Sequence, residues 1–371
     1  MQRMQQIETG KIADRQLLII GILYTIGDPI LIVPSILADR AQGDAWVSAL
    51  LAWGGGLGFL LLYRALARTF PGMGVIEMCE TALGRMLGRG AALLVLLPFW
   101  ILLSASLLRE LSDFMTTQVM PETPVQAFYI IIVIVVLYGL NLGLEPVVRS
   151  GEILFPWVFG LFGLLTLFLL PEFKAVNVEP VMAHGWEPVL KGSYAMLAIP
   201  FMEVFTLLML LPYVSGASDK AVRQFTLSIA LGGFIVVFVI VLSLMSLGPD
   251  VTARSIYPTY VMAKKIRIGN FLERMEIIIT IMWMITMYFK LIVTMFAVVV
   301  ATAKLSRLKS YRPLLMPFGT LLVILAQLIT PNTIEYYDFT ASVWPLYAFT
   351  VCILFPAGLL VAGKVRGRKF R

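Results

Sequence analysis

Long apolar runs alternate with short polar stretches from residue 17 to residue 362. A membrane-spanning helix needs about 20 mostly apolar residues, and ten runs approach that length. They lie at 17–37, 45–67, 91–118, 126–146, 150–170, 192–214, 224–248, 271–303, 313–331 and 340–362. We therefore predict an all-α integral membrane protein with about ten transmembrane helices, forming one transmembrane domain over residues 1–371.

Lysine and arginine are distributed unevenly between the two sides of these runs. Membrane proteins keep an excess of both residues on the cytoplasmic side. If the two termini share one side, that side collects the basic groups after the second run, after the eighth run and at the C-terminus. They include Arg64, Arg68, Arg85, Arg89, Lys304, Arg307, Lys309, Arg312, Lys364, Arg366, Arg368, Lys369 and Arg371. We predict that both termini are cytoplasmic.

The connection 249–270 departs from this pattern, because it lies on the other side and yet contains Arg254, Lys264, Lys265 and Arg267. Apolar residues such as Tyr257 are interleaved with these charges. Two interpretations stay open: an amphipathic segment at the outer membrane interface, and a solvated basic loop.

The first run is interrupted near its middle, in the stretch LYTIGDPILIVP at residues 23–34. Pro29 cannot donate a backbone hydrogen bond, Gly27 accepts unusual backbone angles, and Asp28 adds a carboxylate. Backbone groups freed within hydrocarbon are costly unless protein or water satisfies them. The stretch is either a plain proline kink or a broken helix that lines a cavity.

The sixth run, SYAMLAIPFMEVFTLLMLLP, carries Pro200 and Glu203 near its middle. Interrupted helices in the first and sixth positions fit a five-plus-five inverted repeat, in which a solute binds at the midplane between the breaks. We predict repeat one at about 15–170 and repeat two at about 190–331, with helices nine and ten extending to 362. Carboxylates at both breaks are candidates for binding an amino group or a coupling proton.

Further charges lie inside the third and eighth predicted helices. Arg109 and Asp113 are four residues apart on one helix face, so they can pair with each other or contact a ligand, whereas Glu110 points elsewhere. Lys290 lies in mid-helix, where an unpaired charge is costly. Its amine either takes the place of a coupling cation or tethers helices by pairing with a carboxylate of the two breaks.

Composition narrows the function classes. The chain is 59% hydrophobic and 14% charged, with a mean hydropathy of +0.89, so little of it lies outside the bilayer. The net charge of +7 fits the cytoplasmic loops of a membrane protein and is no signal of nucleic-acid binding. Two cysteines and one histidine, His184, cannot form a metal cluster. With no nucleophilic triad or phosphate loop either, we predict neither an enzyme nor a cofactor.

Small and aromatic residues complete the pattern. Glycines recur in GGGLG at 54–58 and GLNLG at 139–143, a spacing typical of closely packed membrane helices. Trp46, Trp186 and Trp344 lie near the ends of runs, and we interpret them as anchors at the membrane interface.

Four stretches resemble one known family. They are QLLIIGILYTIGDPILIVPS, TPVQAF at the start of the fourth run, PFMEVFTLLMLLPYV in the sixth and ERMEIIITIMWMITMYFKLIVTMFA in the eighth. They resemble the spore germination permease family, the B subunits of nutrient germinant receptors, within the amino acid–polyamine–organocation superfamily. The likeness covers essentially the whole chain. It implies a LeuT-like fold with broken helices 1 and 6.

The resemblance also implies a function. Members of the family bind amino acids, and some bind sugars, nucleosides or ions, to trigger germination. The expected partners are an A subunit and a lipoprotein C subunit, in the inner membrane of the spore of an endospore-forming bacterium. The alternative is a proton-coupled secondary amino-acid permease that uses Asp28, Glu203 or Lys290.

Mapped onto this chain, the family's pocket would be built by the two breaks and walled by the third and eighth helices. Its residues would be Thr25, Ile26, Gly27, Asp28, Pro29, Phe99, Leu103, Leu107, Ile199, Pro200, Phe201, Glu203, Trp283 and Thr286. Asp28 departs from the glycine-rich break that is usual in superfamily permeases. If ionised, it would repel the carboxylate of a simple α-amino acid.

Overall fold

The first apolar run forms two helices instead of one. α1 (Asp14–Ile26) is followed by its capping residue, Gly27, and α2 (Pro29–Ala41) begins with Pro29 as its first residue. The N–H that proline lacks would have no partner within the helix at that position. A proline that would disrupt the interior of a continuous helix therefore fits the start of a new one.

The computed structural model describes residues 7–8, 10–182, 185–215, 218–266 and 274–369; His184 lies outside them. The other elements of the first half are β1 (Ile12–Ala13), η1 (Gln42–Asp44), α3 (Ala45–Thr69), α4 (Val75–Leu83), α5 (Arg85–Ala91), η2 (Ala92–Leu96), α6 (Leu97–Phe114), η3 (Met115–Val119), α7 (Val125–Leu142), α8 (Leu144–Leu169), η4 (Leu170–Glu172) and η5 (Ala175–Val178). The second half contains α9 (Trp186–Met196), η6 (Leu197–Met202), η7 (Glu203–Met209), η8 (Leu211–Tyr213), β2 (Val214–Ser215), α10 (Ser218–Leu247), α11 (Pro249–Arg254), α12 (Pro258–Lys265), α13 (Glu276–Leu305), η9 (Arg312–Leu314), α14 (Leu315–Leu328), α15 (Thr333–Ser342), α16 (Trp344–Phe349), η10 (Thr350–Leu354) and α17 (Phe355–Lys369).

Within the described residues, eight helical stretches are long and apolar enough to cross a membrane, or up to nine if the bent pair Arg312–Leu328 and Thr333–Ser342 counts as one. The first two predicted runs account for the difference between nine and ten. α1 has 13 residues, roughly 20 Å at the helical rise, and is too short to span alone. α2 and α3, joined through η1, form one stretch, Pro29–Thr69, which is counted once.

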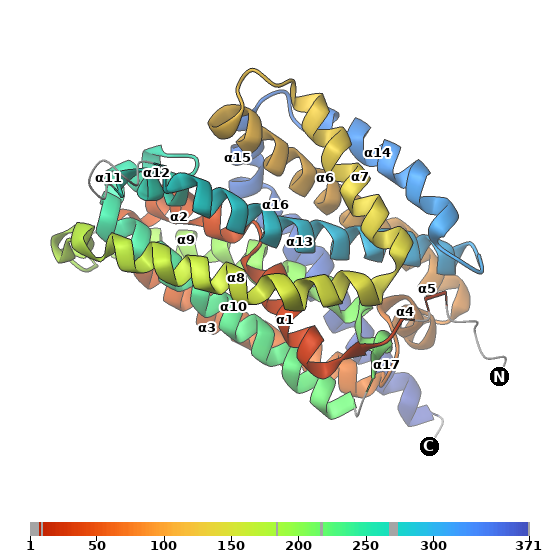
Figure 1. The fold of residues 1–371 in the computed structure, drawn as a ribbon. Coiled ribbons are helices and arrows are strands. Elements are labelled where there is room, and N and C mark those ends of the chain that lie inside the picture. The colour runs from red at the N-terminus through yellow and green to blue at the C-terminus, as the bar shows by residue number, and fades with distance from the viewer. Residues whose placement is uncertain (1–6, 9, 183–184, 216–217, 267–273, 370–371) are drawn as a thin grey trace.

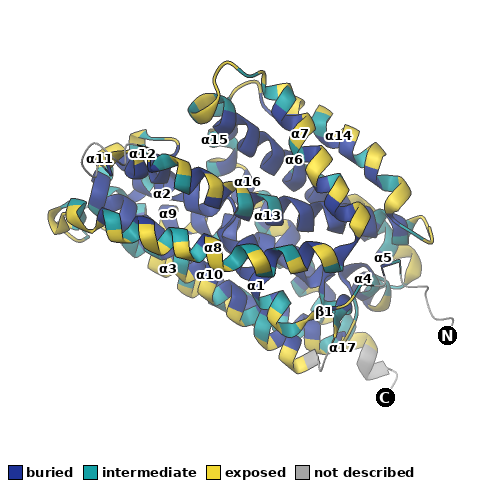
Figure 2. Cartoon of the chain, in the orientation of Figure 1, coloured by how far each residue is buried: buried dark blue, intermediate teal, exposed yellow. Residues whose placement is uncertain are grey.

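The bundle has a buried centre and a periphery that exposes apolar side chains (Figure 2). Most residues of α1, α2, α6 and α13 are buried. α7, α8 and α14 expose large apolar groups, among them Ile130, Ile134, Ile153, Leu167, Met316 and Leu328. A soluble protein rarely exposes so much apolar surface, so this belt is the surface that lipid covers.

The start of α1 and the end of α17 lie at the same end of the molecule, beside α4 and α5 (Figure 1). Near it β1 and β2 pair in parallel, with Ile12 opposite Val214 and Ala13 opposite Ser215. The shared end agrees with the prediction that the two termini lie on one side. The assignment of that side to the cytoplasm stays a prediction.

The connection between α10 and α13 forms α11 and α12 at the opposite end (Figure 1). Pro258, Tyr260 and Met262 are buried, and the Thr259 hydroxyl donates a hydrogen bond of 2.5 Å to the carbonyl of Ile30. The described part of this connection is therefore packed against the bundle, and a fully solvated loop does not fit it. Residues 267–270 lie outside the described residues.

Close helix packing, predicted for the glycines at 54–58 and 139–143, is found at some of them. A Cβ at Gly56 would lie 2.4 Å from the ring of Phe201, and one at Gly139 would lie 2.7 Å from Tyr288. These glycines let helices pack closely. A Cβ at Gly54 or Gly58 would meet no atom of the described residues within 4 Å, so this spacing is not explained by close packing there.

Candidate solute-binding site

The break between α1 and α2 is shaped by its glycine. A Cβ at Gly27 would lie 2.9 Å from Cδ and 3.0 Å from Cβ of Lys290, closer than ordinary contacts allow. Glycine thus lets α13 approach the broken backbone. This approach brings the Lys290 amine beside the carboxylate of Asp28, the residue between the two half-helices.

The second interruption is a change of helix type without a gap. α9 continues into the π-helix η6, which contains Pro200, and then into the 3₁₀-helix η7, which begins at Glu203. Proline removes a backbone donor, and local π and 3₁₀ turns re-satisfy the freed groups in membrane helices. Glu203 therefore lies at a junction between two hydrogen-bond patterns, and it is 1% exposed.

Lys290 joins the two interruptions. Its side chain is fully buried, and its amine forms ion pairs with Asp28 Oδ1 and with Glu203 Oε2, the latter at 2.5 Å. The contact with Glu203 is an ion pair whose angles do not meet those of a hydrogen bond. Since a buried charge is costly unless it is paired, the lysine stabilises both carboxylates and they stabilise it.

Two aromatic side chains complete the surroundings of Glu203. Trp344 donates from Nε1 to Glu203 Oε1 at 2.6 Å, and the Tyr24 hydroxyl donates to the Glu203 carbonyl at 3.1 Å. The Lys290 amine lies 5.4 Å from the centre of the Tyr24 ring, within range of a cation–π interaction. Side chains from α1, α16 and α13 therefore all contact Glu203.

A small cavity of about 10 Å³ opens beside this cluster. Its lining consists of Asp28, Leu103, Ser106, Leu107, Ile199, Glu203, Tyr336, Phe339, Thr340 and Trp344. Such a volume is about enough for one water molecule. The lining combines two carboxylates with aliphatic and aromatic side chains, which suits a small solute with a polar head and an apolar body.

The sequence-predicted site residues divide into two groups. Asp28, Glu203, Ile199, Leu103 and Leu107 line the cavity together. The others do not line it. They are Ile26, Gly27, Pro29 and Pro200 at the interruptions, Thr25 and Phe201 toward α10, Phe99 stacked on Trp344 at 5.5 Å, and Trp283 and Thr286 within α13.

Five lining residues were missed: Ser106, Tyr336, Phe339, Thr340 and Trp344. The interpretation of Trp344 as an interface anchor is wrong, since it is 3% exposed and bonded to Glu203. Three of the missed residues come from α15, whose ten residues TIEYYDFTAS are too polar and short to resemble a membrane span. The sequence contains one signal for such residues: the carboxylate of Glu203 lies inside a membrane helix and needs a hydrogen-bond donor from another segment.

The charges of α6 have separate roles. Arg109 bonds Asp113 at 2.8 Å and also donates to the carbonyls of Ala326 and Thr330, so the predicted pairing is confirmed and ties α6 to the end of α14. Glu110 points elsewhere, as predicted. One of its oxygens lies 3.3 Å from the Tyr336 hydroxyl, and the other has no hydrogen-bond partner among the described residues.

Similarity to solved structures agrees with this architecture. MhsT, solved in complex with L-phenylalanine, superimposes with a TM-score of 0.63 at 15% identity, covering 95% of this chain and 98% of that one. Mhp1, a nucleobase-cation-symport-1 family transporter solved in a closed conformation with bromovinylhydantoin bound, gives 0.62 at 11% identity, covering 98% and 92%. At such identities the likeness shows the fold alone, which is the LeuT-like fold that the family resemblance implied.

Relatives with similar sequences are spore germination proteins. Protein KB of Bacillus subtilis (strain 168) is 28% identical over 359 residues, 96% of this chain and 95% of its own length. Protein YndE of the same organism is 27% identical over 368 residues, 97% and 98% of the two chains. The family model described as spore germination protein, the spore permease family, matches residues 11–334. This chain therefore belongs to the spore permease family, as a non-enzymatic, multi-pass membrane protein of spore germination.

Proposed function

We propose that this chain is the nutrient-binding subunit of a germinant receptor and that its ligand is an amino acid bound between the two interrupted helices. One observation carries the proposal: the cavity is lined at once by Asp28 of the first interruption and by Ile199 and Glu203 of the second. Solutes of transporters with broken helices bind at such junctions.

The charges around the cavity favour an ammonium group. Asp28 and Glu203 share one cation, Lys290, so two carboxylates face one amine. A positively charged group on the solute would offset the remaining charge. The hydroxyl of Ser106 lines the cavity and has no partner among the described residues, so it is free to bond a polar head.

The apolar lining favours an aliphatic or aromatic side chain on the solute. Leu103, Leu107 and Ile199 contribute aliphatic groups to the lining, and Phe339 and Trp344 contribute aromatic rings. A hydrophobic amino acid combines both features. The repulsion expected between Asp28 and a ligand carboxylate is weakened here, because Asp28 is paired with Lys290.

Binding requires the cavity to open. Its volume of about 10 Å³ is smaller than any amino acid. α15 supplies Tyr336, Phe339 and Thr340, and it meets α14 at a bend of 97°. An outward displacement of α15 would enlarge the cavity without disturbing the ion pairs, and closure around the solute would be the conformational signal.

A binding assay on the purified protein tests the site. A ligand stabilises the folded state by mass action, by about 2.7 kcal/mol at 100 times its dissociation constant, so a screen of amino acids, sugars and nucleosides should raise the melting temperature for hydrophobic amino acids. Ile199→Trp should fill the cavity and abolish that shift. Ile134→Trp, at a lipid-facing position of α7, is the matched control. An unchanged dose–response in Ile199→Trp would refute the placement.

The proposal extends to partners and location. An A subunit and a lipoprotein C subunit would assemble with this chain in the spore inner membrane, with both termini cytoplasmic. The two relatives named as spore germination proteins match this chain over 95% and 98% of their own lengths, which supports a role in germination. Deleting the chain should abolish germination triggered by its nutrient and leave uptake by vegetative cells unchanged. Retained germination would contradict the receptor role.

A second candidate function is a proton-coupled amino-acid permease. Glu110 favours it, because this buried carboxyl has an oxygen without a partner among the described residues and lies beside the Tyr336 hydroxyl. Ionisable groups inside the membrane often relay protons. Uptake of labelled amino acid into proteoliposomes that contain this chain alone, driven by a pH gradient, would establish the permease and displace the receptor.

A further inference from the structure

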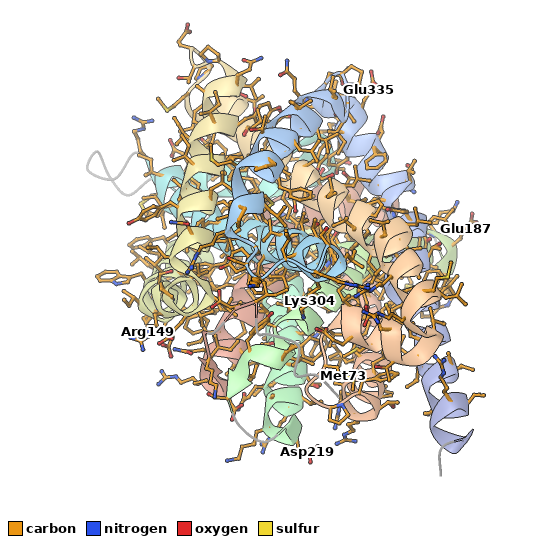
Figure 3. All side chains as sticks on the ribbon, turned by 90° about the vertical axis from the view of Figure 1, so that its right-hand side faces the viewer. Met73, Arg149, Glu187, Asp219, Lys304 and Glu335 are labelled. Atoms are coloured by element: carbon orange, nitrogen blue, oxygen red, sulfur yellow. The ribbon has the colours of Figure 1, made fainter. Side chains whose placement is uncertain are left out.

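A second and larger cavity, of about 370 Å³, lies at the end of the molecule that holds α4 and α5. Viewed toward that end, Lys304 lies near the middle of the molecule, while Arg149 and Asp219 lie at its edge (Figure 3). The lining consists of Ile7, Gly72, Glu77, Arg85, Arg89, Pro212, Tyr213, Lys304, Arg307, Leu308 and Lys309. None of these residues lines the solute cavity.

The charge on this lining is strongly unbalanced. Five cationic side chains face a single carboxylate, Glu77. Lys304 pairs with Glu77 at 2.5 Å, and Arg89 pairs with Glu80 at 2.6 Å. Arg85, Arg307 and Lys309 form no ion pair with any described residue, so a surplus of positive charge faces the cavity.

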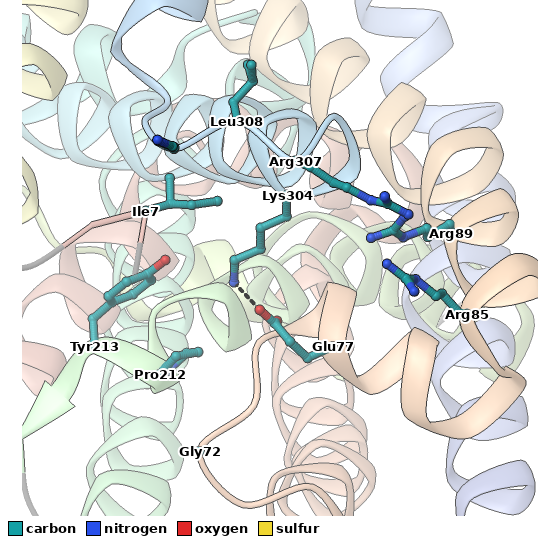
Figure 4. Close-up of a pocket in the computed structure, with 11 residues that line it drawn as sticks. Ile7, Gly72, Glu77, Arg85, Arg89, Pro212, Tyr213, Lys304, Arg307 and Leu308 are labelled. Atoms are coloured by element: carbon teal, nitrogen blue, oxygen red, sulfur yellow. Dashed lines mark ion pairs between the residues drawn. The ribbon is translucent and has the colours of Figure 1, made fainter. Parts of the chain in front are cut away.

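Figure 4 shows how these groups are arranged. The guanidinium groups of Arg85, Arg89 and Arg307 gather on one side of the Lys304–Glu77 pair, and Tyr213 lies on the other. Like charges that share one cavity repel each other, and an anion between them relieves this repulsion. The arrangement is therefore most stable with a multivalent anion bound.

The backbone directs these arginines to the cavity. Arg85 begins α5 directly after Gly84, which has a φ of +92° that favours glycine. Arg307 follows the end of α13 and has a φ of +56°, as the left-handed residue of the turn that closes this helix. In this turn the Leu308 N–H donates to the Ala303 carbonyl at 2.9 Å and the Arg307 N–H donates to the Lys304 carbonyl at 3.2 Å. This turn sets the position from which the Arg307 side chain reaches the cavity.

We propose that this cavity binds a phosphate group, through the guanidinium groups of Arg85, Arg89 and Arg307. Arginine binds phosphate with paired, charge-assisted hydrogen bonds, and the volume lies within the range of ligand sites. Basic pockets between membrane helices bind the phosphates of anionic lipid headgroups. The same chemistry takes a soluble phosphate. A phosphate from either source would connect α5, through Arg85 and Arg89, with the segment that follows α13, through Arg307.

The test uses the full-length protein in an uncharged detergent at low salt. Inorganic phosphate is titrated while the melting temperature is followed, and retention of phosphatidylglycerol against phosphatidylcholine is measured by native mass spectrometry. Loss of one charge-assisted hydrogen bond weakens binding by about tenfold, so Arg85→Gln combined with Arg307→Asn should weaken it by at least that factor. Asparagine is chosen at 307 because it tolerates the left-handed backbone.

Arg149→Gln is the matched control, since Arg149 is an exposed arginine at the same end that does not line the cavity. A shift with phosphate that the double variant loses identifies a soluble phosphate as the ligand. Selective retention of phosphatidylglycerol that the double variant loses identifies a lipid headgroup. Binding of neither probe by the wild type, or equal binding by all three proteins, overturns the proposal.

Discussion

The two interrupted helices break the α-helical pattern in different ways. At the first, Gly27 and Asp28 lie between two separate helices, and Pro29 starts the second of them. At the second, Pro200 lies inside a π-helix, and Glu203 begins a 3₁₀-helix with no residue left outside a helix. A glycine two residues before the proline permits a true break, whereas a proline between bulky apolar residues is accommodated by wider and tighter turns.

The difference determines how each carboxylate is held. Asp28 has its charge compensated by Lys290, which can approach because Gly27 has no side chain. Glu203 shares that lysine and adds the indole of Trp344. The first interruption therefore depends on backbone space, and the second on side chains from distant segments.

Lys290→Met has the largest expected effect, because it removes the cation that both interruptions share. Breaking a buried ion pair by deleting one partner costs about 3–5 kcal/mol, so the melting temperature and the yield in detergent should fall sharply. Lys290→Met combined with Asp28→Asn and Glu203→Gln should regain much of the loss. A single variant as stable as the wild type would show that the cluster does not join the two helices.

Gly27→Leu tests the space at the first interruption. Its side chain would collide with Lys290, and overpacking of this kind costs about 1–3 kcal/mol. The protein should still insert in the membrane but lose its response to the ligand, as measured by the thermal shift. Gly54→Leu, where no atom lies within 4 Å of the added Cβ, is the control and should change neither property. An equal thermal shift with ligand in Gly27→Leu and Gly54→Leu would contradict the dependence of the first interruption on backbone space.

Trp344→Phe tests the second interruption and has the smallest expected effect. It removes the indole donor and leaves one oxygen of Glu203 without a hydrogen bond, which costs about 1–3 kcal/mol. We expect the lower part of that range, because Glu203 keeps its ion pair with Lys290. Thermal melting of this variant beside Phe339→Leu, a cavity substitution that removes no hydrogen bond, separates the lost bond from lost packing. Equal melting temperatures for both variants and the wild type would assign Trp344 no role at Glu203.

The sequence by itself determined the membrane setting and the positions of both interruptions. Apolar runs of about 20 residues have no other favourable environment, and the effects of Gly27, Pro29 and Pro200 on the backbone are local. It also indicated that Arg109 pairs with Asp113, because residues four apart share a helix face. The family resemblance rested on the same local stretches.

Only the tertiary structure decided which side chains surround the cavity. α15 contributes three lining residues because of the bend between α14 and α15, which no local sequence pattern predicts. Trp344 bonds Glu203 from 141 positions away. Likewise Lys290 lies 262 positions from Asp28, and either carboxylate or both could have been its partner. Such contacts depend on how distant helices pack, and a local pattern specifies the helix but not its neighbour.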